Sequence, residues 1–586
     1  MGVGSGVSKR QQELHLAAPC AGWRSLSPAN VLIAVLSLAA VGGVYAPSLQ
    51  YRFILDDHRF TSDSRVQSAG HVWEYFTNYV WAQFTGGPPS FYRPLFVLWM
   101  RMNFVFCAMS PWGWHLLSIL KHVGVALLLY LLVWSLLRDS TAALLAAVLF
   151  ALHPAHTECV AWVTVPDPLM TIGVLSTLLL YLRYAQETVA PAQNKKTKKK
   201  GHRATVVKTT PRSALPWLIA SAVVCFLTLL AKETAIIVPV IVFFLTLFML
   251  RGDIDSDEAT NGENSFLTRS LIRLLTALRI TLPFVCAAVL YLLLRFNAFS
   301  GNLGSLTQHL PWRSVLLSWP GVLWFYVKVL LWPVRSYAYG DPTLAETFSV
   351  RGVLVPGLAV GCLAVGLGVA LFWLRRKARR DLPPSEVAGV EYALSIGTLL
   401  LVFPILLALN LNVLNPGDFL HGRYVYLASA GMMMIVAAAC HLAGRARKPL
   451  LWAAGSLAIV FVVLTVSQEK LWKDDLTLFT AAHQFAPNNP WVALNLERAN
   501  VQAALGLVEQ GRCSEVLPVF ERVSRNYPEE WSAWAGLGYC YFTLNNLPKA
   551  EESLHRAAQL SRDPRTVELW QELRAQMGLS TAAPLD

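Results

Sequence analysis

Long apolar runs follow one another along this chain from residue 29 to residue 467. A helix needs about 20 predominantly apolar residues to cross the hydrocarbon core of a bilayer. Runs that approach this length with few charges cover residues 29–47, 113–136, 140–153, 158–184, 214–231, 233–250, 276–297, 353–374, 391–410, 424–443 and 449–467. The pattern predicts an all-helical, polytopic membrane protein with about eleven crossings.

A further apolar stretch, 314–333, is interrupted by Pro320, carries Lys328 and ends at Pro333. It can either span the bilayer, or enter and return on one side as buried irregular backbone. Clusters of lysine and arginine mark cytoplasmic loops, and they all fall on one side only if 314–333 does not cross. These clusters are Lys9/Arg10/Arg24, nine positions from Arg183 to Arg212, Arg251/Arg269/Arg273, Arg375 to Arg380, and Arg445/Arg447/Lys448. We therefore predict that 314–333 is a re-entrant segment.

The same topology divides the chain. It predicts a cytoplasmic N-terminal segment (1–28), a transmembrane domain (29–467) with a long first external loop (48–112), and an external domain (468–586). The first apolar run follows a polar segment and precedes no A-x-A-like cleavage site, so we predict an uncleaved first span rather than a signal peptide.

Composition supports this class. Of 586 residues, 55% are hydrophobic and only 15% are charged, which excludes a disordered chain, a disulfide-stapled secreted module and an ordinary cytosolic enzyme. The net charge is +17 before Gln468 and −4 after it. Because the basic excess lies in short loops, it indicates membrane orientation and anionic lipid rather than nucleic acid. Nine scattered cysteines without a CxxC pair indicate neither a zinc site nor a disulfide framework.

The residues after Gln468 carry a repeat signal. Phe479 and Pro487 have the same eight-residue offset as Phe520 and Pro528, and this offset is typical of a tetratricopeptide repeat. Further residues fit the two-helix pattern of that repeat, namely Trp534, Leu537, Gly538, Tyr541, Ala550, Leu554 and Ala557.

The spacing of the repeat is uneven. The step from Phe520 to Leu554 is 34 residues, the period of a tetratricopeptide repeat, whereas the step from Phe479 to Phe520 is 41. We therefore predict an insertion near 506–512 and an α-solenoid of two to three repeats, with a concave surface for extended peptides.

Adjacent carboxylates, Asp56 and Asp57, follow the first span in the segment F-I-L-D-D-H-R-F. At a membrane surface, desolvation and like-charge repulsion can raise the pKa of one such group and suit it to general-base work. The alternative is a helix N-cap with a solvated neighbour. Their place at the junction of span and loop favours the functional interpretation.

Two arginines beside aromatic residues are candidates for phosphate binding. Arg93 lies in F-Y-R-P-L, and Arg423 lies in H-G-R-Y-V-Y-L at the external end of a predicted span. A guanidinium at headgroup level can hold a lipid-linked phosphate. A cation-π or lipid contact is the alternative for Arg93, and a snorkelling side chain is the alternative for Arg423.

Polar groups also interrupt the external ends of the spans. The turn H-P-A-H-T-E carries His153, His156 and Glu158. It lacks the i, i+4 histidine pair of a zincin helix, so we predict that it hydrogen-bonds to substrate or orients a carboxylate rather than binding a metal. Asp167, between two prolines partway into the predicted fourth span, is either a functional carboxylate or a helix cap. Lys232 and Glu233 are either substrate ligands, a turn or a mutual ion pair.

The sequence has no GxxxxGK[ST], HExxH or GxSxG motif, so any chemistry must use a preactivated donor. The motif order resembles the transmembrane and tetratricopeptide-repeat-containing O-mannosyltransferases, of the GT-C class of glycosyltransferases, and their bacterial relatives. The resemblance rests on L-D-D, F-Y-R-P-L, W-H-L-L-S-I-L-K-H, H-P-A-H-T-E-C-V-A-W, A-K-E-T-A, Y-V-K-V-L-L-W-P and G-R-Y-V-Y-L-A-S, followed by the repeats.

The resemblance implies inverting transfer of a sugar, mannose or another hexose, from a polyprenyl-phosphate donor to a protein hydroxyl at the extracytoplasmic face. It implies that Asp56, or else Asp57, is the base, that 29–467 is the catalytic domain and that the repeats present acceptor protein. Arg93 and Arg423 match motif positions and are expected to hold the departing phosphate. No cofactor is indicated, although a divalent metal is possible.

The chain departs from the family pattern at two positions. It has Val165-Pro166-Asp167 where the family commonly has Gly-Arg-Ala-Asp, and Gly422-Arg423 where it often has Glu-Arg. The donor sugar is therefore left open. The short repeat array favours a bacterial inner-membrane protein with periplasmic repeats, and the alternative is an endoplasmic-reticulum protein with luminal repeats.

Three other functions stay open. They are a glycosyltransferase with a lipid or polysaccharide acceptor, a transporter or flippase for lipid-linked sugar, and a non-catalytic scaffold that acts through its repeats.

Overall fold

The computed structural model describes residues 27–82, 91–189, 214–250, 264–302, 310–334, 344–413, 420–561 and 564–580. Over these ranges the chain is helical and contains no strand, which confirms the predicted all-α class. The chain divides into two compact units. The membrane unit is Met1–Ser336, Leu344–Asn415 and Gly422–Lys470, and the C-terminal unit is Tyr337–Thr343, Pro416–His421 and Leu471–Asp586. Of the predicted cytoplasmic segment 1–28, residues 1–26 lie outside the described residues.

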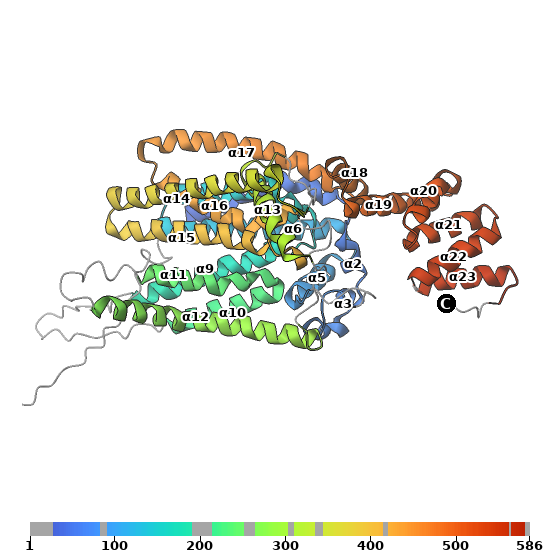
Figure 1. The fold of residues 1–586 in the computed structure, drawn as a ribbon, viewed down its shortest axis with the longest axis horizontal. Helices are drawn as coiled ribbons and strands as arrows, with labels where there is room; N and C mark the ends of the chain where they lie inside the picture. The colour runs from blue at the N-terminus through green and yellow to red at the C-terminus, as the bar shows by residue number, and fades with distance from the viewer. Residues whose placement is uncertain are drawn as a thin grey trace, which may run out of the picture. The chain divides into compact units, whose positions relative to one another are not determined.

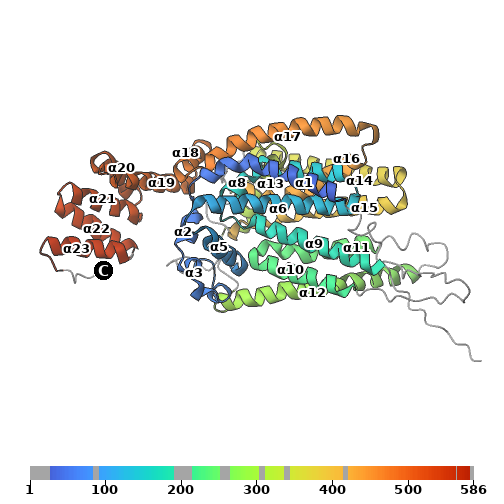
Figure 2. The same ribbon diagram turned by 180° about the vertical axis from the view of Figure 1, so that it is seen from behind.

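Long helices of the membrane unit run side by side, as both views of the ribbon show (Figures 1 and 2). Its α-helices are α1 (Pro28–Gly42), α2 (Asp56–Ser62), α3 (Ser64–Gln67), α4 (Glu74–Thr77), α5 (Pro94–Cys107), α6 (Pro111–Leu137), α7 (Ser140–Ala151), α8 (Thr157–Ala161), α9 (Asp167–Val189), α10 (Leu215–Ala231), α11 (Val238–Met249), α12 (Asn264–Ala298), α13 (Trp312–Leu331), α14 (Val355–Asp381), α15 (Pro384–Leu407), α16 (Tyr426–His441) and α17 (Arg447–Glu469). Short helical turns connect or extend them, namely η2 (Gly43–Gln50), η3 (Ala69–His71), η4 (Pro154–His156), η5 (Glu233–Ile237), η6 (Val350–Leu354), η7 (Leu411–Val413), η8 (Gly422–Val425) and η9 (Gly444–Ala446).

Local sequence sets several of the helix boundaries. Ser27 caps α1, and Pro28 follows at the first helical position, where its missing N–H costs nothing. Pro111 begins α6 in the same way. The break between α6 and α7 is made by Arg138, in a left-handed conformation with φ of 56°, and by Asp139, which caps α7. One apolar stretch is thereby divided into two helices.

Nine of the described helices are long and apolar enough to cross a membrane, or ten if the bent pair Ser140–Ala151 and Pro154–Ala161 is one span. Eight of these nine match predicted crossings, and the ninth is α13. The remaining predicted crossings correspond to the bent pair and to two shorter apolar helices, Leu215–Ala231 and Glu233–Met249. The chain is a multi-pass membrane protein, as predicted.

The predicted fourth span begins too early. The sequence pattern extends it over 158–184, but the structure ends α8 at Ala161 and begins α9 only at Asp167. Pro166 disfavours helical backbone at Val165, just before it, and Pro168 lies in the first turn of α9, where proline is tolerated. Asp167 is therefore at the start of a helix and not partway into a span, which corrects its predicted position.

Pro320 does not interrupt the backbone as expected, because α13 continues through it from Trp312 to Leu331. The helix nevertheless contacts one end of the bundle with both of its halves. The indole of Trp319 donates to the carbonyl of Leu409, just beyond α15 (3.1 Å), while the carbonyl of Leu330 lies 3.0 Å from Nε2 of His153, just beyond α7. A helix with both halves at one end lies across the bundle, an arrangement that agrees with the prediction that this segment does not cross (Figure 1).

Two of the basic clusters predicted to be cytoplasmic, Arg375 to Arg380 and Arg445/Arg447/Lys448, lie within the described residues, where α14 turns into α15 and α16 into α17, at the opposite end of the bundle (Figure 1). Asp139 there accepts from Arg447 at 2.7 Å and lies 3.0 Å from Nδ1 of His441. Arg379 of α14 forms an ion pair with Glu391 of α15 at 2.7 Å. The end at which α2 to α5 lie is called the first-loop end below.

The C-terminal unit consists of helices that each pack against the next. They are α18 (Asp475–Phe485), α19 (Pro490–Val508), α20 (Cys513–Asn526), α21 (Trp531–Thr543), α22 (Leu547–Ser561) and α23 (Pro564–Gln576), preceded by η10 (Lys470–Trp472). The glycines predicted from the repeat pattern face close neighbours. A Cβ at Gly538 would lie 2.5 Å from Leu554 of α22, so a side chain here would separate α21 from α22.

The uneven repeat spacing corresponds to one long helix. α19 has 19 residues, whereas α21 has 13, and the extra length of α19 ends at Val508, within the region predicted to hold the insertion. The additional residues therefore extend helix α19 and do not form a loop between two helices.

Candidate active site at the first-loop end of the membrane unit

The two adjacent carboxylates follow a strained turn. Leu55 has φ of 51° and ψ of −125°, a conformation that costs about 1–3 kcal/mol in a residue with a side chain. The backbone N–H of Asp57 then donates to the carbonyl of Ile54 at 2.9 Å. As a result the neighbouring side chains differ in environment. Asp57 is completely buried, whereas Asp56 is partly exposed.

Asp57 joins the first loop to the segment before α9. One carboxylate oxygen accepts from both the hydroxyl (2.7 Å) and the backbone N–H (3.1 Å) of Thr164, and the other accepts from the backbone N–H of Ile54 (3.1 Å). Thr164 lies 107 residues away in sequence, and sequence reasoning did not identify it. Asp57 is thus held rigidly on both oxygens, and Asp56 is the neighbour with access to solvent.

Burial raises the pKa of Asp57 to about 7, against the opposing effect of its hydrogen bonds from Thr164 and Ile54. The folded protein therefore keeps a proton that the unfolded chain releases near pH 4, so the free energy of unfolding is expected to fall as pH rises from about 4 to 7. The thermal midpoint of the membrane unit in detergent, measured from pH 5 to pH 8, checks this. Asp57→Asn cannot titrate, and its midpoint should fall less over the same range. An equal fall in both proteins would contradict the assignment.

A second buried carboxylate shapes the first loop. Asp63 binds the guanidinium of Arg65 at 2.7 Å, and both side chains are at most 1% exposed. Arg65 also donates to the carbonyls of Tyr79 (3.1 Å) and Val80, and its own carbonyl accepts from the hydroxyl of Tyr75. These bonds fold the loop back on itself next to α5. No pattern in the sequence distinguished this pair from ordinary loop charges.

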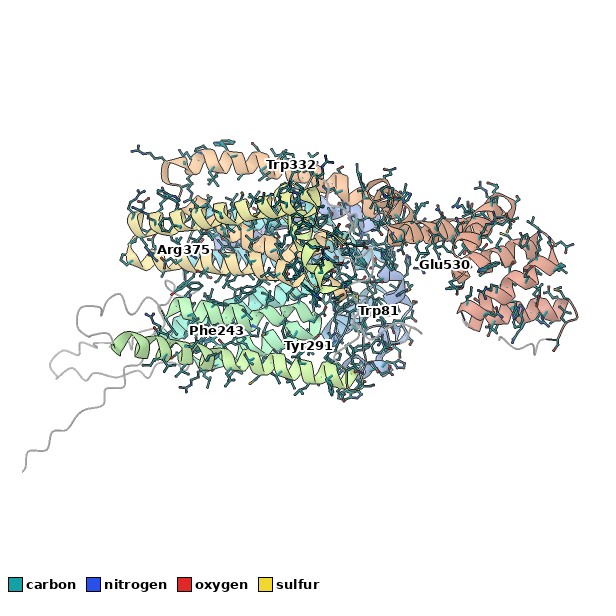
Figure 3. All side chains as sticks on the ribbon, viewed as in Figure 1. Trp81, Phe243, Tyr291, Trp332, Arg375 and Glu530 are labelled. Carbon is teal, nitrogen blue, oxygen red and sulfur yellow. The ribbon has the colours of Figure 1, made fainter. Side chains whose placement is uncertain are left out.

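Aromatic packing closes the loop against the bundle. Phe60, in the same helix α2 as Asp56 and Asp57, contacts Trp81 with ring centroids 4.8 Å apart. Tyr291 of α12 donates to the carbonyl of Tyr92 at 3.3 Å. Trp81 and Tyr291, labelled in Figure 3, both lie where the first loop meets the bundle.

Arg93 forms a bidentate ion pair. Its Nε and Nη2 donate to the two carboxylate oxygens of Glu233 at 2.8 and 2.6 Å. Its guanidinium also lies over the ring of Phe91, 4.2 Å from the centroid. The predicted alternative of a mutual pair between Lys232 and Glu233 is therefore wrong, because Glu233 pairs with Arg93 from a segment 140 residues away.

Lys232 pairs instead with Asp167. Its Nζ lies 2.6 Å from Oδ1 of Asp167, and each side chain is 5% exposed. Within the part of the chain that the structure describes, Oδ2 of Asp167 has no hydrogen-bond partner. A buried ion pair is costly to form, and removal of one partner is strongly destabilising because the other charge is left unpaired.

Glu158 and Arg423 form the third pair. Glu158 accepts from the backbone N–H of Arg423 at 3.0 Å and from its guanidinium at 3.3 Å. The backbone can come this close because residue 422 is glycine, where a Cβ would lie 3.3 Å from Oε2 of Glu158. Arg423 also lies over Trp162, 4.7 Å from the ring centroid. Sequence analysis selected both charges but not their pairing.

Tyr424 brings the second and third pairs together. Its ring lies 5.6 Å from Nζ of Lys232 and 5.4 Å from Cζ of Arg423. Glu233, the partner of Arg93, is the next residue after Lys232 in the chain. Three cations are thus collected at the first-loop end, each matched by a carboxylate. Tyr424 was not predicted as a site residue, although it lies inside the G-R-Y-V-Y-L motif.

The two histidines of the H-P-A-H-T-E turn are in a packed region. His153 and His156 are completely buried, and Nε2 of His156 lies 2.8 Å from the hydroxyl of Ser429. The ring of His156 is 4.5 Å from those of Phe150 and Tyr426. Among the described residues, no group of three or more His, Cys, Asp or Glu is arranged to hold a metal ion. Substrate binding by these histidines stays a prediction.

Comparison with known proteins gives the following matches. No family model matches the chain. It is 26% identical to "Protein O-mannosyl-transferase TMTC3" of Mus musculus over 555 residues, which cover 90% of this chain and 54% of the relative. It is also 26% identical to "Protein O-mannosyl-transferase TMTC1" of Homo sapiens, covering 88% of this chain and 57% of the relative. The chain therefore spans about half the length of the curated relatives it matches.

Among solved structures, the chain matches the apo crystal structure of the oligosaccharyltransferase of Archaeoglobus fulgidus, with 12% identity and a TM-score of 0.33 over 80% of this chain and 59% of that chain. The sequence matches are the informative ones. They confirm the resemblance predicted from the motifs: over about 90% of its length, this chain is similar in sequence to a protein O-mannosyl-transferase.

Proposed function

We propose that this chain is a GT-C glycosyltransferase that moves mannose, or another hexose, from a polyprenyl-phosphate donor to a hydroxyl group of an acceptor protein. The observation that carries the proposal is the gathering of three cations and a pair of adjacent carboxylates at one end of the membrane unit. The printed names of the relatives, protein O-mannosyl-transferases, support the reaction class and the sugar.

In this proposal Asp56 is the base. It is partly exposed, while Asp57 beside it is buried with both oxygens occupied. The acceptor oxygen attacks C1 of the sugar as its proton passes to the carboxylate of Asp56. The bond from C1 to the donor phosphate breaks, and the configuration at C1 is inverted in one displacement. Asp57 positions Asp56 through the turn at Leu55 and the bonds to Thr164.

The cations Arg93, Lys232 and Arg423 serve the phosphate. Each is already paired with a carboxylate, so the three pairs carry no net charge when no donor is bound. Pairing also prevents the loss of stability that a buried charge without a partner would cause. A donor phosphate can accept hydrogen bonds from the same N–H groups. These cations stabilise the transition state most strongly, because the negative charge on the phosphate grows as the C1–O bond breaks. Arg93 is the most exchangeable, because its partner Glu233 is 28% exposed, whereas Glu158 and Asp167 are 3% and 5% exposed.

The cellular arrangement follows from the topology. The site lies at the end of the bundle opposite to the basic loops, so it faces the extracytoplasmic side, in the bacterial periplasm or the lumen of the endoplasmic reticulum. The repeats of the C-terminal unit would hold acceptor protein on that side. Membrane lipid is the second partner, since the donor's polyprenyl chain remains in the bilayer.

A transfer assay with the full chain in lipid nanodiscs tests the proposal. Polyprenyl-phosphate-mannose and a mixture of unmodified envelope or secretory proteins are supplied, and the acceptors are analysed by intact mass and glycopeptide sequencing. A hexose added to serine or threonine is the expected result. Sugar found only on lipid would assign a lipid acceptor, and donor carried across sealed vesicles without transfer would assign transport; either outcome overturns the proposal.

A further inference from the structure

Two cysteines, Cys513 and Cys540, lie in the last 116 residues of the chain, those from Leu471 to Asp586. Cys513 is the first residue of α20, and Cys540 lies in α21. Their side chains are 1% and 0% exposed. Both belong to one hydrophobic core, together with Phe520 of α20 and Leu537 of α21.

The two thiols meet inside this core. Both are free thiols in the structure, and both belong to the same cluster of buried side chains; the thiol of Cys513 is a hydrogen-bonding neighbour of Cys540. The helices that carry them, α20 and α21, pack directly against each other. A disulfide requires two Cα atoms within about 7 Å of each other, so the bond requires α20 and α21 to hold the two residues at this spacing.

We propose that Cys513 and Cys540 form a disulfide that ties α20 to α21 in the C-terminal unit. Two S–H bonds break and one Sγ–Sγ bond forms. The two electrons and two protons pass to the disulfide of a thiol-disulfide oxidoreductase, which is reduced to its dithiol. Because the thiols are buried in the folded unit, the bond forms while the unit folds and before its core closes.

Two other described cysteines differ from this pair in exposure. Cys286 and Cys362 are exposed on helices α12 and α14 of the membrane unit. They serve as reference thiols, because a reagent that enters the bilayer reaches them without unfolding. The scattered cysteine spacing indicated no disulfide framework, and it could not show that positions 27 residues apart meet in one core.

The inference goes beyond the proposed sugar transfer and does not depend on it. It requires only that the C-terminal unit reaches an oxidising compartment, where disulfides persist. A chain that transfers no sugar can still carry the bond, and an active transferase can lack it. Failure of one proposal is therefore distinguishable from failure of the other.

Mass spectrometry of the full chain tests the bond. Membranes are treated with an alkylating reagent in denaturant, without reductant, and the protein is digested with trypsin. The expected product is peptide 513–522 linked to peptide 526–549, with a mass two hydrogens below the sum of the separate peptides. Reduction should release both peptides, and Cys286 and Cys362 should be alkylated throughout. Alkylated Cys513 and Cys540 in the unreduced sample would overturn the proposal.

Single variants provide the second measurement. In Cys513→Ser, Cys540 should become available to alkylation in denaturant, and in Cys540→Ser, Cys513 should. Reduction of the wild type should lower the temperature at which protease cuts the C-terminal unit, whereas reduction of Cys513→Ser should leave its lower onset unchanged. An equal shift in the variant, or none in the wild type, would contradict a stabilising bond between these residues.

Discussion

Asp56→Asn is expected to reduce sugar transfer by about 10²- to 10⁴-fold, the usual contribution of a positioned general base. The amide keeps the size of the side chain but cannot take the proton of the acceptor hydroxyl. Because Asp56 is partly exposed, the change should leave the thermal midpoint and the binding of donor nearly unchanged. Initial transfer rates at saturating donor, normalised to the amount of folded protein, provide the measurement.

Glu74→Gln is the matched control for this substitution. Glu74 is another partly exposed carboxylate of the first loop, and it contacts His71 at 2.6 Å. The same chemical change there should preserve transfer. If Asp56→Asn kept more than about a tenth of the wild-type rate, Asp56 would not be the base. Loss of donor binding in that variant would instead indicate a structural role for Asp56.

Lys232→Met is expected to have the largest effect on stability. It removes one partner of a pair whose side chains are each 5% exposed, and a charge left alone in such a place costs about 3–5 kcal/mol. The thermal midpoint of the membrane unit should fall steeply. The double variant Lys232→Met/Asp167→Leu removes both charges and should recover most of the stability, while transfer should remain low because the cation that serves the phosphate is missing.

Arg379→Met is the control for the loss of an ion pair as such. Arg379 is 67% exposed where it binds Glu391 at the opposite end of the bundle, and exposed pairs contribute less than about 1 kcal/mol. The thermal midpoint of the Arg379→Met variant should stay near that of the wild type. A double variant as unstable as Lys232→Met alone would show that the cost comes from packing and not from the unpaired charge of Asp167.

Most of the charged residues of the site could be predicted from the sequence, but the ion pairs that they form could not. Asp56 and Asp57 stand out because two carboxylates end an apolar run, and Arg93 and Arg423 stand out because arginine beside aromatic residues is unusual next to a span. Their partners lie far away in the chain. Arg93 meets Glu233 across 140 residues, and Arg423 meets Glu158 across 265. Such pairings depend on how helices assemble, which no local pattern encodes.

Residues without an unusual local pattern were missed for the same reason. Thr164 lies between two valines and Tyr424 lies within an aromatic motif, so neither stands out in the sequence. Only their contacts with Asp57 and Lys232 give them a role. Conversely, His153 and His156 attract attention as a possible ligand set. The structure places them in a core with Phe150 and Tyr426, because neutral imidazoles pack well when one nitrogen finds a partner.

The sequence by itself determined the class of this protein, its multi-pass helices and the end of the bundle at which the charges gather. These properties depend on apolar length and on lysine and arginine in short loops, both of which are local and act through the bilayer. Only the folded structure shows that Asp57 is buried while Asp56 is not, that α13 continues as one helix through Pro320, and that Lys232 pairs with Asp167. These outcomes depend on contacts between segments that are far apart in the chain. A buried charge is stable only when it is paired, and the packing of the helices determines which opposite charge lies close enough.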